Sequence, residues 1–358
     1  MNVPAGNSGA GSHADTDSKE APRPSSNAGE AAPGPDAGAA SKAVRGTDAR
    51  AATGAVHDIT ASTLRDWPLP MPGAHADKEV RGHVLIVAGS REMPGALLLA
   101  ATAALRAGAG KLTIVTAASV TAALGVALPE AQVIGLEETP EGGLRARSPT
   151  DAADADAATV IPALQQACER ASAILIGPGM QDKQACAALV AALLPCCGKA
   201  PVILDAGAMC VAGGDNCMRF HTPVLLTPHA GELAGLTGED KQHIAADPQT
   251  ASRAAAQRLN AVVALKGSTT IITAPDGGTW SHTGGNTGLA ISGSGDVLAG
   301  LIAGLAARGA TLEQAAAWGV ALHAMAGEQL SLRHGPLGYL AREISAEVPA
   351  LLRALSAH

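Results

Sequence analysis

The stretch NTGLAISGSGDVLAG, residues 286–300, joins a run of glycines and other small residues to an apolar segment. After Asp296, the apolar residues Val297, Leu298 and Leu301 follow at helical spacing, with small residues between them that permit close packing. Free backbone N–H groups and the helix dipole make such a helix entrance an anion site. The stretch therefore predicts a helix with an anion site at its entrance, and Asp296 places a carboxylate there.

Short apolar runs alternate with helical segments from about residue 80 onward. The candidate strands are residues 83–89, 111–117, 131–137, 173–179, 201–207, 223–229 and 261–267, and helical spacing occurs at 94–107, 183–194 and 250–259. Continuous apolar strands joined by helices are typical of a parallel sheet covered on both faces. The run 269–283 has Pro-Asp-Gly-Gly at its centre and predicts an antiparallel hairpin late in the chain. We therefore expect a three-layer α/β/α sandwich with a mostly parallel central sheet.

The composition limits the classes of partner. The 358 residues carry a net charge of -7 and include only one Phe, one Tyr and three Trp, which argues against a nucleic-acid partner. No apolar stretch reaches the roughly 18 residues that span a bilayer, so no membrane segment is expected. Six cysteines without a C-x-x-C pair or a preceding signal peptide predict reduced thiols in a cytoplasmic protein. We expect no protein-built metal site.

Residues 1–57 are rich in Ala, Gly, Pro, Ser and Asp and have almost no large apolar residue. Such a segment cannot bury enough surface to offset its ordering entropy, so we expect a disordered tail before one domain, 58–358. In that domain, the short motifs GSREMPGA, GPGM, DAGAM, TPHAGE and KGSTT each follow a candidate strand. Ligands of open α/β sheets gather beyond the carboxyl ends of the strands, so these loops predict one cleft.

Familiar phosphate motifs do not account for this cleft. GAGKLT, residues 108–113, resembles the end of a Walker A motif, but it runs from helix into strand and is better explained as a helix C-cap. Asp296 alone could be a helix cap. Beside an anion held by backbone amides, it could instead accept the proton of a hydroxyl that attacks a phosphorus atom. That second role explains why an acid stands in an anion site.

Other polar residues of the loops also have two interpretations. Lys266 is either a surface lysine or a contact to a nucleotide phosphate. His229 is either a structural hydrogen-bonding residue or a ligand-binding one. Glu232 and Asp205 are either first-turn helix acids or carboxylates that help to hold a hydrated metal ion. Gly179 is either part of a tight turn or a point of close backbone approach to a ligand.

Together, GSREMPGA, IGPGM, LDAGAM, TPHAGE, LKGSTTII and NTGLAISGSGDVLAGLIAG resemble the ADP/ATP-dependent NAD(P)H-hydrate dehydratases of the ribokinase-like superfamily. The resemblance covers roughly residues 60–355. It implies a ribokinase-like fold and repair of the (6S)-hydrate of NADH or NADPH. In such repair, ADP or ATP phosphorylates the ring hydroxyl, and elimination of phosphate restores the reduced nicotinamide.

The resemblance also assigns residues. It implies that the hydrate is bound by Ala96, Gly179, His229 and Asp296, with Asp296 as the catalytic residue. It implies that the nucleotide is bound by Lys266, Gly267, Ser268, Thr269, Thr270 and Gly295. Two departures from the family pattern are Met93-Pro94, where relatives often carry an aromatic residue, and Ser268-Thr269, where many show Ala-Gly.

The resemblance further implies Mg²⁺, a homotetramer and a separate NAD(P)H-hydrate epimerase as functional partner. Bacterial relatives tend to use ADP, so we expect ADP to serve at least as well as ATP. Two alternatives remain: a small-molecule kinase of the thiamine-precursor type, whose product keeps its phosphate, and a nucleotide sensor without turnover.

Overall fold

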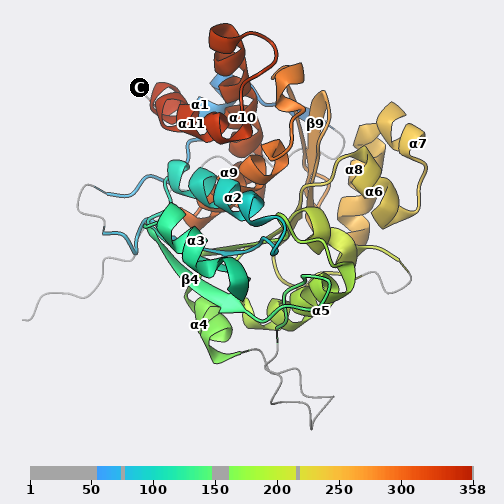
Figure 1. Cartoon of the computed structure of the whole chain (residues 1–358). Helices are drawn as coiled ribbons and strands as arrows, with labels where there is room; N and C mark the ends of the chain where they lie inside the picture. Colours follow the sequence, from blue (N-terminus) through green and yellow to red (C-terminus); the bar gives the residue numbers. More distant parts are fainter. Residues whose placement is uncertain (1–54, 74–76, 147–160, 215–217, 357–358) are drawn as a thin grey trace, which may run out of the picture. The chain divides into compact units, whose positions relative to one another are not determined.

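A mixed sheet forms the middle layer of the computed structural model, which describes residues 55–73, 77–146, 161–214 and 218–356 (Figure 1). Its strands are β1 (Val56–Asp58), β2 (His83–Val87), β3 (Lys111–Ala117), β4 (Ala131–Leu136), β5 (Ala173–Ile176), β6 (Val202–Leu204), β7 (Val224–Leu226), β8 (Val262–Leu265), β9 (Thr269–Thr273) and β10 (Thr279–Thr283). Within the described residues the strand order is β1-β10-β9-β8-β7-β6-β5-β2-β3-β4. β9 pairs antiparallel with both of its neighbours, and the other pairs are parallel.

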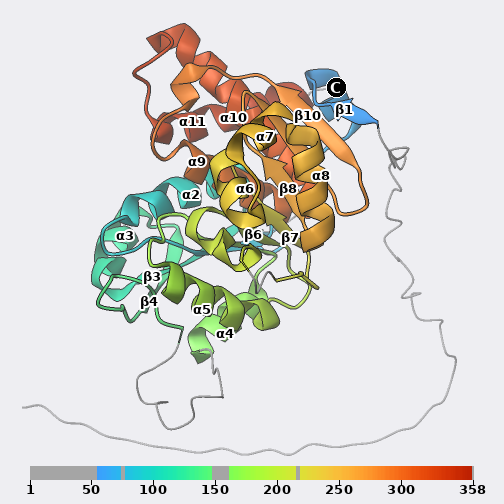
Figure 2. The same cartoon turned by 90° about the vertical axis from the view of Figure 1, so that its right-hand side faces the viewer.

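Helices cover both faces of this sheet (Figure 2). One face carries α1 (Ala61–Asp66), α2 (Pro94–Arg106), α3 (Thr121–Ala127), α9 (Ser294–Ala307), α10 (Leu312–His334) and α11 (Ala341–Ser356). The other face carries α4 (Pro162–Arg170), α5 (Lys183–Leu193), α6 (Ala230–Thr237), α7 (Lys241–Ala246) and α8 (Pro248–Leu259). The short 3₁₀ helix η4 (Ala206–Ala212) follows β6. The predicted three-layer α/β/α sandwich is confirmed, as is the hairpin formed by β9 and β10.

The two cores follow from the alternation of side chains along each strand. In β2, Val84 and Ile86 pack into the core on the α9 side, while Leu85 and Val87 pack into the core on the α5 side. All four are completely buried, as the continuous apolar sequence of a doubly covered strand requires.

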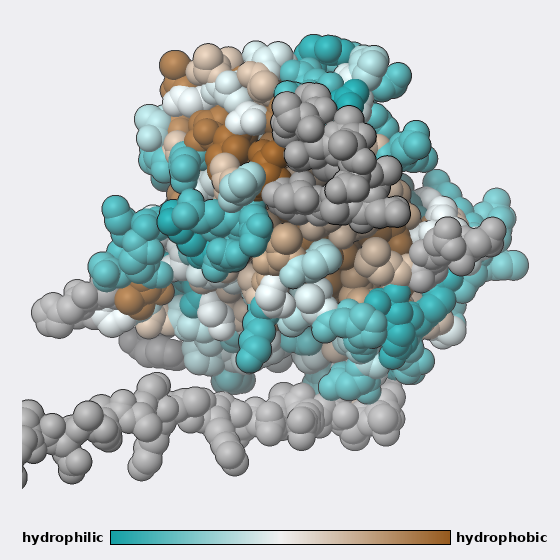
Figure 3. All heavy atoms as spheres, turned by 90° about the horizontal axis from the view of Figure 1, so that it is seen from below, coloured by the Kyte–Doolittle hydropathy of each residue, from teal (hydrophilic) through white to brown (hydrophobic). Residues whose placement is uncertain are grey.

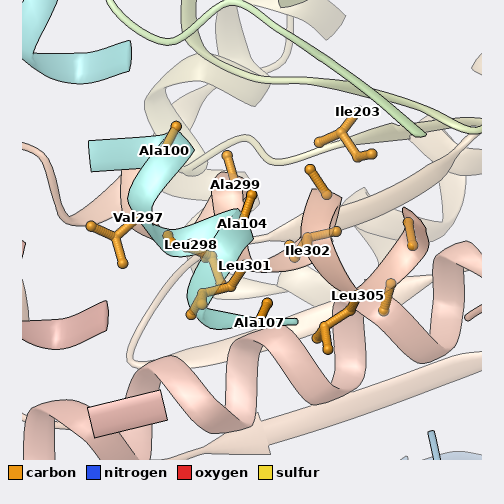
Figure 4. Close-up of a cluster of buried hydrophobic side chains, with 14 of the residues drawn as sticks. Ala100, Ala104, Ala107, Ile203, Val297, Leu298, Ala299, Leu301, Ile302 and Leu305 are labelled. Carbon is orange, nitrogen blue, oxygen red and sulfur yellow. The ribbon is translucent and has the colours of Figure 1, made fainter. Parts of the chain in front are cut away.

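Close packing of α9 against α2 depends on small residues, and Figure 4 shows the two helices meeting through Ala100 and Ala104 on one side and Leu298 and Leu301 on the other. A Cβ at Gly300 would overlap the Ala100 carbonyl group. The helix that follows the glycine turn is therefore buried against the neighbouring helix as well as the sheet, which fixes the position of its N-terminus.

The predicted tail boundary falls within β1, because residues 56 and 57 pair with β10. Residues 1–54 of that predicted tail lie outside the described residues. Among the six cysteines, Cys217 also lies outside them, and the five described cysteines are free thiols. In the described ranges, no helix combines the length and apolarity that a membrane crossing requires. On the face seen in Figure 3, hydrophilic residues cover much of the surface, with smaller hydrophobic areas between them.

Candidate active site

The chain reverses its direction of travel across the sheet between β2 and β5, and the loops after these two strands are in contact. The Gly89 amide donates to the Pro178 carbonyl at 2.7 Å. Gly179 has a φ of +71°, and a Cβ there would lie 2.7 Å from the Met93 carbonyl oxygen and 2.8 Å from the Ala96 Cβ. Only glycine fits this approach, and the crevice at such a switch point is where open α/β sheets bind ligands.

A charge cluster built around the buried Asp205 lies beyond the next strands, at the ends of β6, β7 and β8. Asp205 is 3% exposed and accepts a 2.5 Å hydrogen bond from the Thr227 hydroxyl. The Lys266 Nζ lies 3.5 Å from Asp205 Oδ1 and 3.8 Å from Glu232 Oε2. The carboxylates of Asp205 and Glu232 thus hold the ammonium group of Lys266 at the carboxyl edge of the sheet.

Asp296 lies in the first turn of α9, close enough to this cluster to interact with it electrostatically. Burial and, to a smaller extent, the neighbouring Asp205 carboxylate raise the pKa of the Asp296 carboxyl, Lys266 opposes them, and the net result is a pKa of about 6. A carboxyl with a pKa near 6 is largely ionised at neutral pH yet remains a stronger base than an ordinary aspartate. It is therefore suited to general-base catalysis.

The entrance of α9 has unused hydrogen-bond donors. Gly293 precedes the helix with a φ of +89° and provides no side-chain cap. Within the described part of the chain, the amides of Gly295 and Asp296 have no hydrogen-bond acceptor, whereas the Val297 amide donates to the Gly293 carbonyl. These two free N–H groups point out of the helix end, where the helix dipole also favours an anion. A Cβ at Gly295 would lie 3.6 Å from the Lys266 Nζ, so the amides and the cation are neighbours.

His229 is the N-cap of α6, and its hydrogen bonds assign its tautomer. The Glu232 amide donates to His229 Nδ1 at 3.0 Å, and the Glu232 carboxylate accepts from the His229 amide at 2.8 Å. Since Nδ1 is an acceptor, the proton of the neutral ring is on Nε2. The side chain is 60% exposed, so His229 offers an N–H donor at the cleft and has no free lone pair for use as a base.

The turn from Lys266 to Thr270 is attached to the α6 loop, because the Lys266 amide donates to the Pro228 carbonyl at 2.7 Å. Gly267 and Ser268 are exposed, and Thr269 is half-buried with its hydroxyl 2.9 Å from that of Thr283. Thr270 is 9% exposed within β9. The first part of KGSTT is thus open to a ligand, while Thr270 faces the interior.

Two groups of predicted site residues therefore form at one sheet edge. Ala96 and Gly179 meet at the switch point, and His229, Lys266, Gly295 and Asp296 surround the charge cluster. The groups are joined at Gly177, where a Cβ would overlap the Asp205 carbonyl group.

Sequence reasoning missed two residues of this region, Thr227 and His323. The threonine contacts Asp205, and the histidine contacts Ser294 at the start of α9. No local pattern marks either, because both contacts join segments distant in sequence. A separate cavity of about 110 Å³ is lined by residues of α1, α10 and α11 and their flanks, and none of the predicted site residues lines it.

Chemically, the edge combines a base, two free amides, a lysine and an N–H donor. That set suits transfer of a phosphoryl group to a hydroxyl: the amides and Lys266 stabilise charge on the phosphoryl group while Asp296 removes the hydroxyl proton.

Comparison with known proteins agrees with this chemistry. The profile of the NAD(P)H-hydrate dehydratase family matches residues 84–350. An ADP-dependent (S)-NAD(P)H-hydrate dehydratase from Xanthomonas campestris is 47% identical, over 83% of this chain and 96% of its own length. The chain also matches bifunctional NAD(P)H-hydrate repair enzymes and spans about half their length.

Solved structures give the same fold. The ADP/ATP-dependent NAD(P)H-hydrate dehydratase from Bacillus subtilis, co-crystallised with ATP and Mg²⁺, has a TM-score of 0.69 at 32% identity, covering 84% of this chain and 99% of its own. A ribokinase-like superfamily protein from Enterococcus faecalis has a TM-score of 0.70 at 26% identity, covering 84% and 96%. The predicted ribokinase-like fold is confirmed, and the chain belongs to the NAD(P)H-hydrate dehydratase family.

Proposed function

We propose that this protein is an ADP- or ATP-dependent (S)-NAD(P)H-hydrate dehydratase, which converts the (6S)-hydrate of NADH or NADPH back to the reduced cofactor. The observation that carries the proposal is Asp296, a carboxylate with a raised pKa beside two free helix amides and Lys266. The identity of the substrate, NAD(P)H hydrate, is inferred from membership of the NAD(P)H-hydrate dehydratase family.

The first step is phosphoryl transfer. The ring hydroxyl of the hydrate attacks the terminal phosphorus of the nucleotide, and its proton passes to the Asp296 carboxylate. The bond from that phosphorus to its bridging oxygen breaks, and the shortened nucleotide leaves with the electron pair. The Gly295 and Asp296 amides and Lys266 stabilise charge on the transferred group.

The second step is elimination. The bond from the ring carbon to the phosphate oxygen breaks, phosphate leaves with the electron pair, and the neighbouring ring carbon loses a proton to water. The carbon–carbon double bond of the dihydronicotinamide forms between these two atoms. With ADP as donor, hydrate and ADP give NAD(P)H, AMP and inorganic phosphate, and the atoms balance.

Each predicted contact has a task in this scheme. Ala96 and Gly179 present a side-chain-poor surface to the hydrated ring, and the His229 Nε2–H donates to a polar group of the substrate. Lys266, Gly267, Ser268 and Thr269 hold the nucleotide, with Gly295 at its phosphates, and Thr270 supports that turn from within β9.

Magnesium fits this site as a companion of the nucleotide rather than as a resident ion. The described residues contain no group of three or more His, Cys, Asp or Glu side chains that could hold a metal. Asp205 and Glu232 flank Lys266 and would hold water molecules of a hydrated Mg²⁺ ion. When bound, the ion neutralises the charge of the phosphates.

The test is to incubate the protein with chemically hydrated NADH, Mg²⁺ and either ADP or ATP. Return of the reduced-nicotinamide absorbance, with ADP at least as effective as ATP, is the expected result, and excess chelator should abolish it. A phosphorylated product that accumulates without this return indicates the thiamine-precursor type of kinase. Nucleotide binding without any product indicates a sensor.

We also propose a cytoplasmic homotetramer that works with a separate NAD(P)H-hydrate epimerase, as the resemblance to the dehydratase family implies. The side chains of Leu332, Leu337 and Leu340, at the end of α10 and in the loop after it, are 81%, 66% and 45% exposed and would be buried between copies. Light scattering should give about four times the chain mass, falling to a smaller species in Leu337→Glu. A monomeric wild-type protein would disprove the tetramer.

A further inference from the structure

The glycine-rich segment 285–294, which leads into α9, is held at both ends by side chains of α10. At its start, the Gly285 amide donates to the Glu328 carboxylate at 2.8 Å. At its end, His323 Nε2 lies 3.1 Å from the Ser294 carbonyl oxygen and 3.0 Å from the Ser294 hydroxyl. The position of the α9 entrance therefore depends on side chains from a helix that lies behind it.

The contact with Ser294 depends on the tautomer of the imidazole. With the proton on Nε2 the ring donates to the Ser294 carbonyl oxygen at 3.1 Å, whereas with the proton on Nδ1 the Ser294 hydroxyl donates to Nε2 at 3.0 Å. Burial lowers the pKa of His323 to about 4, with Lys266 acting in the same direction, so the ring is neutral at pH 7. A neutral ring with the proton on Nε2 is a hydrogen-bond donor that adds no charge behind the anion site.

The acceptor of this bond belongs to the same peptide group as a free donor. The Ser294 carbonyl and the Gly295 amide share one planar peptide unit, and the Gly295 N–H is one of the two amides without an acceptor in the described residues. A hydrogen bond to the carbonyl oxygen fixes the plane of that unit and polarises its N–H, because linked hydrogen bonds strengthen one another.

We infer that His323 carries its proton on Nε2 and is a positioning residue for phosphoryl transfer, which orients and polarises the Ser294–Gly295 peptide so that the Gly295 N–H meets the transferred group. The inference rests on the proposed function for the identity of that group. Since the charge on the transferred oxygens grows during the reaction, the contribution of His323 is larger in the transition state than in nucleotide binding.

Two variants separate hydrogen bonding from packing. His323→Phe keeps a ring of similar size but removes the donor, and His323→Gln keeps an N–H near the position of Nε2. His334→Phe makes the same change at an exposed position further along α10 and is the matched control. We expect His323→Phe to lower kcat about 10-fold with KM for ADP changed less than about 3-fold, since a donor is weakened and not removed. His323→Gln should restore most of kcat, and His334→Phe should equal the wild type.

A second readout does not require turnover. Labelling serine carbonyls with ¹³C and glycine amides with ¹⁵N selects Ser–Gly pairs, and the sequence contains three, at 8–9, 292–293 and 294–295. Loss of the bond to the Ser294 carbonyl should shift the 294–295 signal in His323→Phe and leave it in place in His334→Phe.

The possible outcomes distinguish failure of the role of His323 from failure of the proposed function. An unmoved 294–295 signal, or a His323→Phe variant with wild-type kcat, overturns the role of His323. So does a loss of kcat that His323→Gln fails to restore while Tm falls in parallel. If the wild type restores no NADH, the proposed function fails, and the NMR signal still tests the hydrogen bond.

Discussion

Replacing Asp296 by asparagine should lower turnover by about 10²–10⁴-fold, the scale of losing a general base. Asparagine keeps the shape of the side chain but cannot take the hydroxyl proton. Affinity for ADP should hold or improve, because one charge that repels the phosphates is gone. Asp240→Asn changes an N-cap aspartate of α7 in the same way and should leave turnover unchanged. A folded Asp296→Asn protein with near-normal turnover would falsify the catalytic assignment.

The raised pKa of about 6 predicts the pH dependence of both activity and stability. Turnover of the wild type should rise as the pH increases through about 6, because the carboxylate is the active form.

For stability, the pKa of Asp296 in the folded protein lies above its unfolded value, so the stabilising contribution is present below pH 4 and is lost as the pH rises through 6. Asp296→Asn should therefore be more stable than the wild type at pH 7, by on the order of 1–3 kcal/mol. The shift would be contradicted if the difference in unfolding free energy between Asp296→Asn and the wild type were the same at pH 5 and at pH 8.

Gly179→Ala should remove most of the activity and much of the stability. Its φ of +71° costs alanine about 1 kcal/mol, and the methyl group would lie 2.7 Å from the Met93 carbonyl oxygen, so overpacking adds about 2 kcal/mol. Relief of the overlap separates the β5 loop from the start of α2. A displacement near 1 Å at a reacting site costs about 100-fold in kcat/KM, which steady-state kinetics would detect.

Gly238 provides the matched control for this variant. Its φ is +78°, close to that of Gly179, but a Cβ there has no atom within 4 Å. Gly238→Ala should therefore lose only the conformational cost of about 1 kcal/mol and keep full activity. If denaturant unfolding gives equal losses for the two variants, close approach at Gly179 is not the reason for its glycine.

The sheet could be predicted because its signals are local. Each buried parallel strand is a short apolar run, and Asp276-Gly277-Gly278 marks the turn between β9 and β10. β1 could not be predicted in the same way, since three residues of mixed polarity carry no periodic signal, and it forms only because β10 offers a free edge.

The same distinction between local signals and tertiary packing applies to the residues of the site. Gly179 lies in a loop and Asp296 in the first turn of α9, and the glycines around both indicate a close approach of backbone to ligand. The Asp205–Thr227 bond and the contact of His323 with Ser294 depend on how strands and helices pack, over separations of 22 and 29 residues. A histidine within an alanine-rich helix has the same local sequence whether it is a core residue or a partner of the anion site.

The most direct test of phosphoryl transfer at this edge follows the ring hydroxyl oxygen. NADH hydrated in ¹⁸O-water carries the label on that hydroxyl, and the protein is then given this hydrate with ADP and Mg²⁺ in ordinary water. Mass spectrometry of the inorganic phosphate should show one ¹⁸O atom for each NADH restored, because the hydroxyl oxygen leaves bonded to phosphorus. Release of the label as water, with unlabelled phosphate, would contradict phosphorylation of the hydroxyl and with it the role of Asp296 as its base.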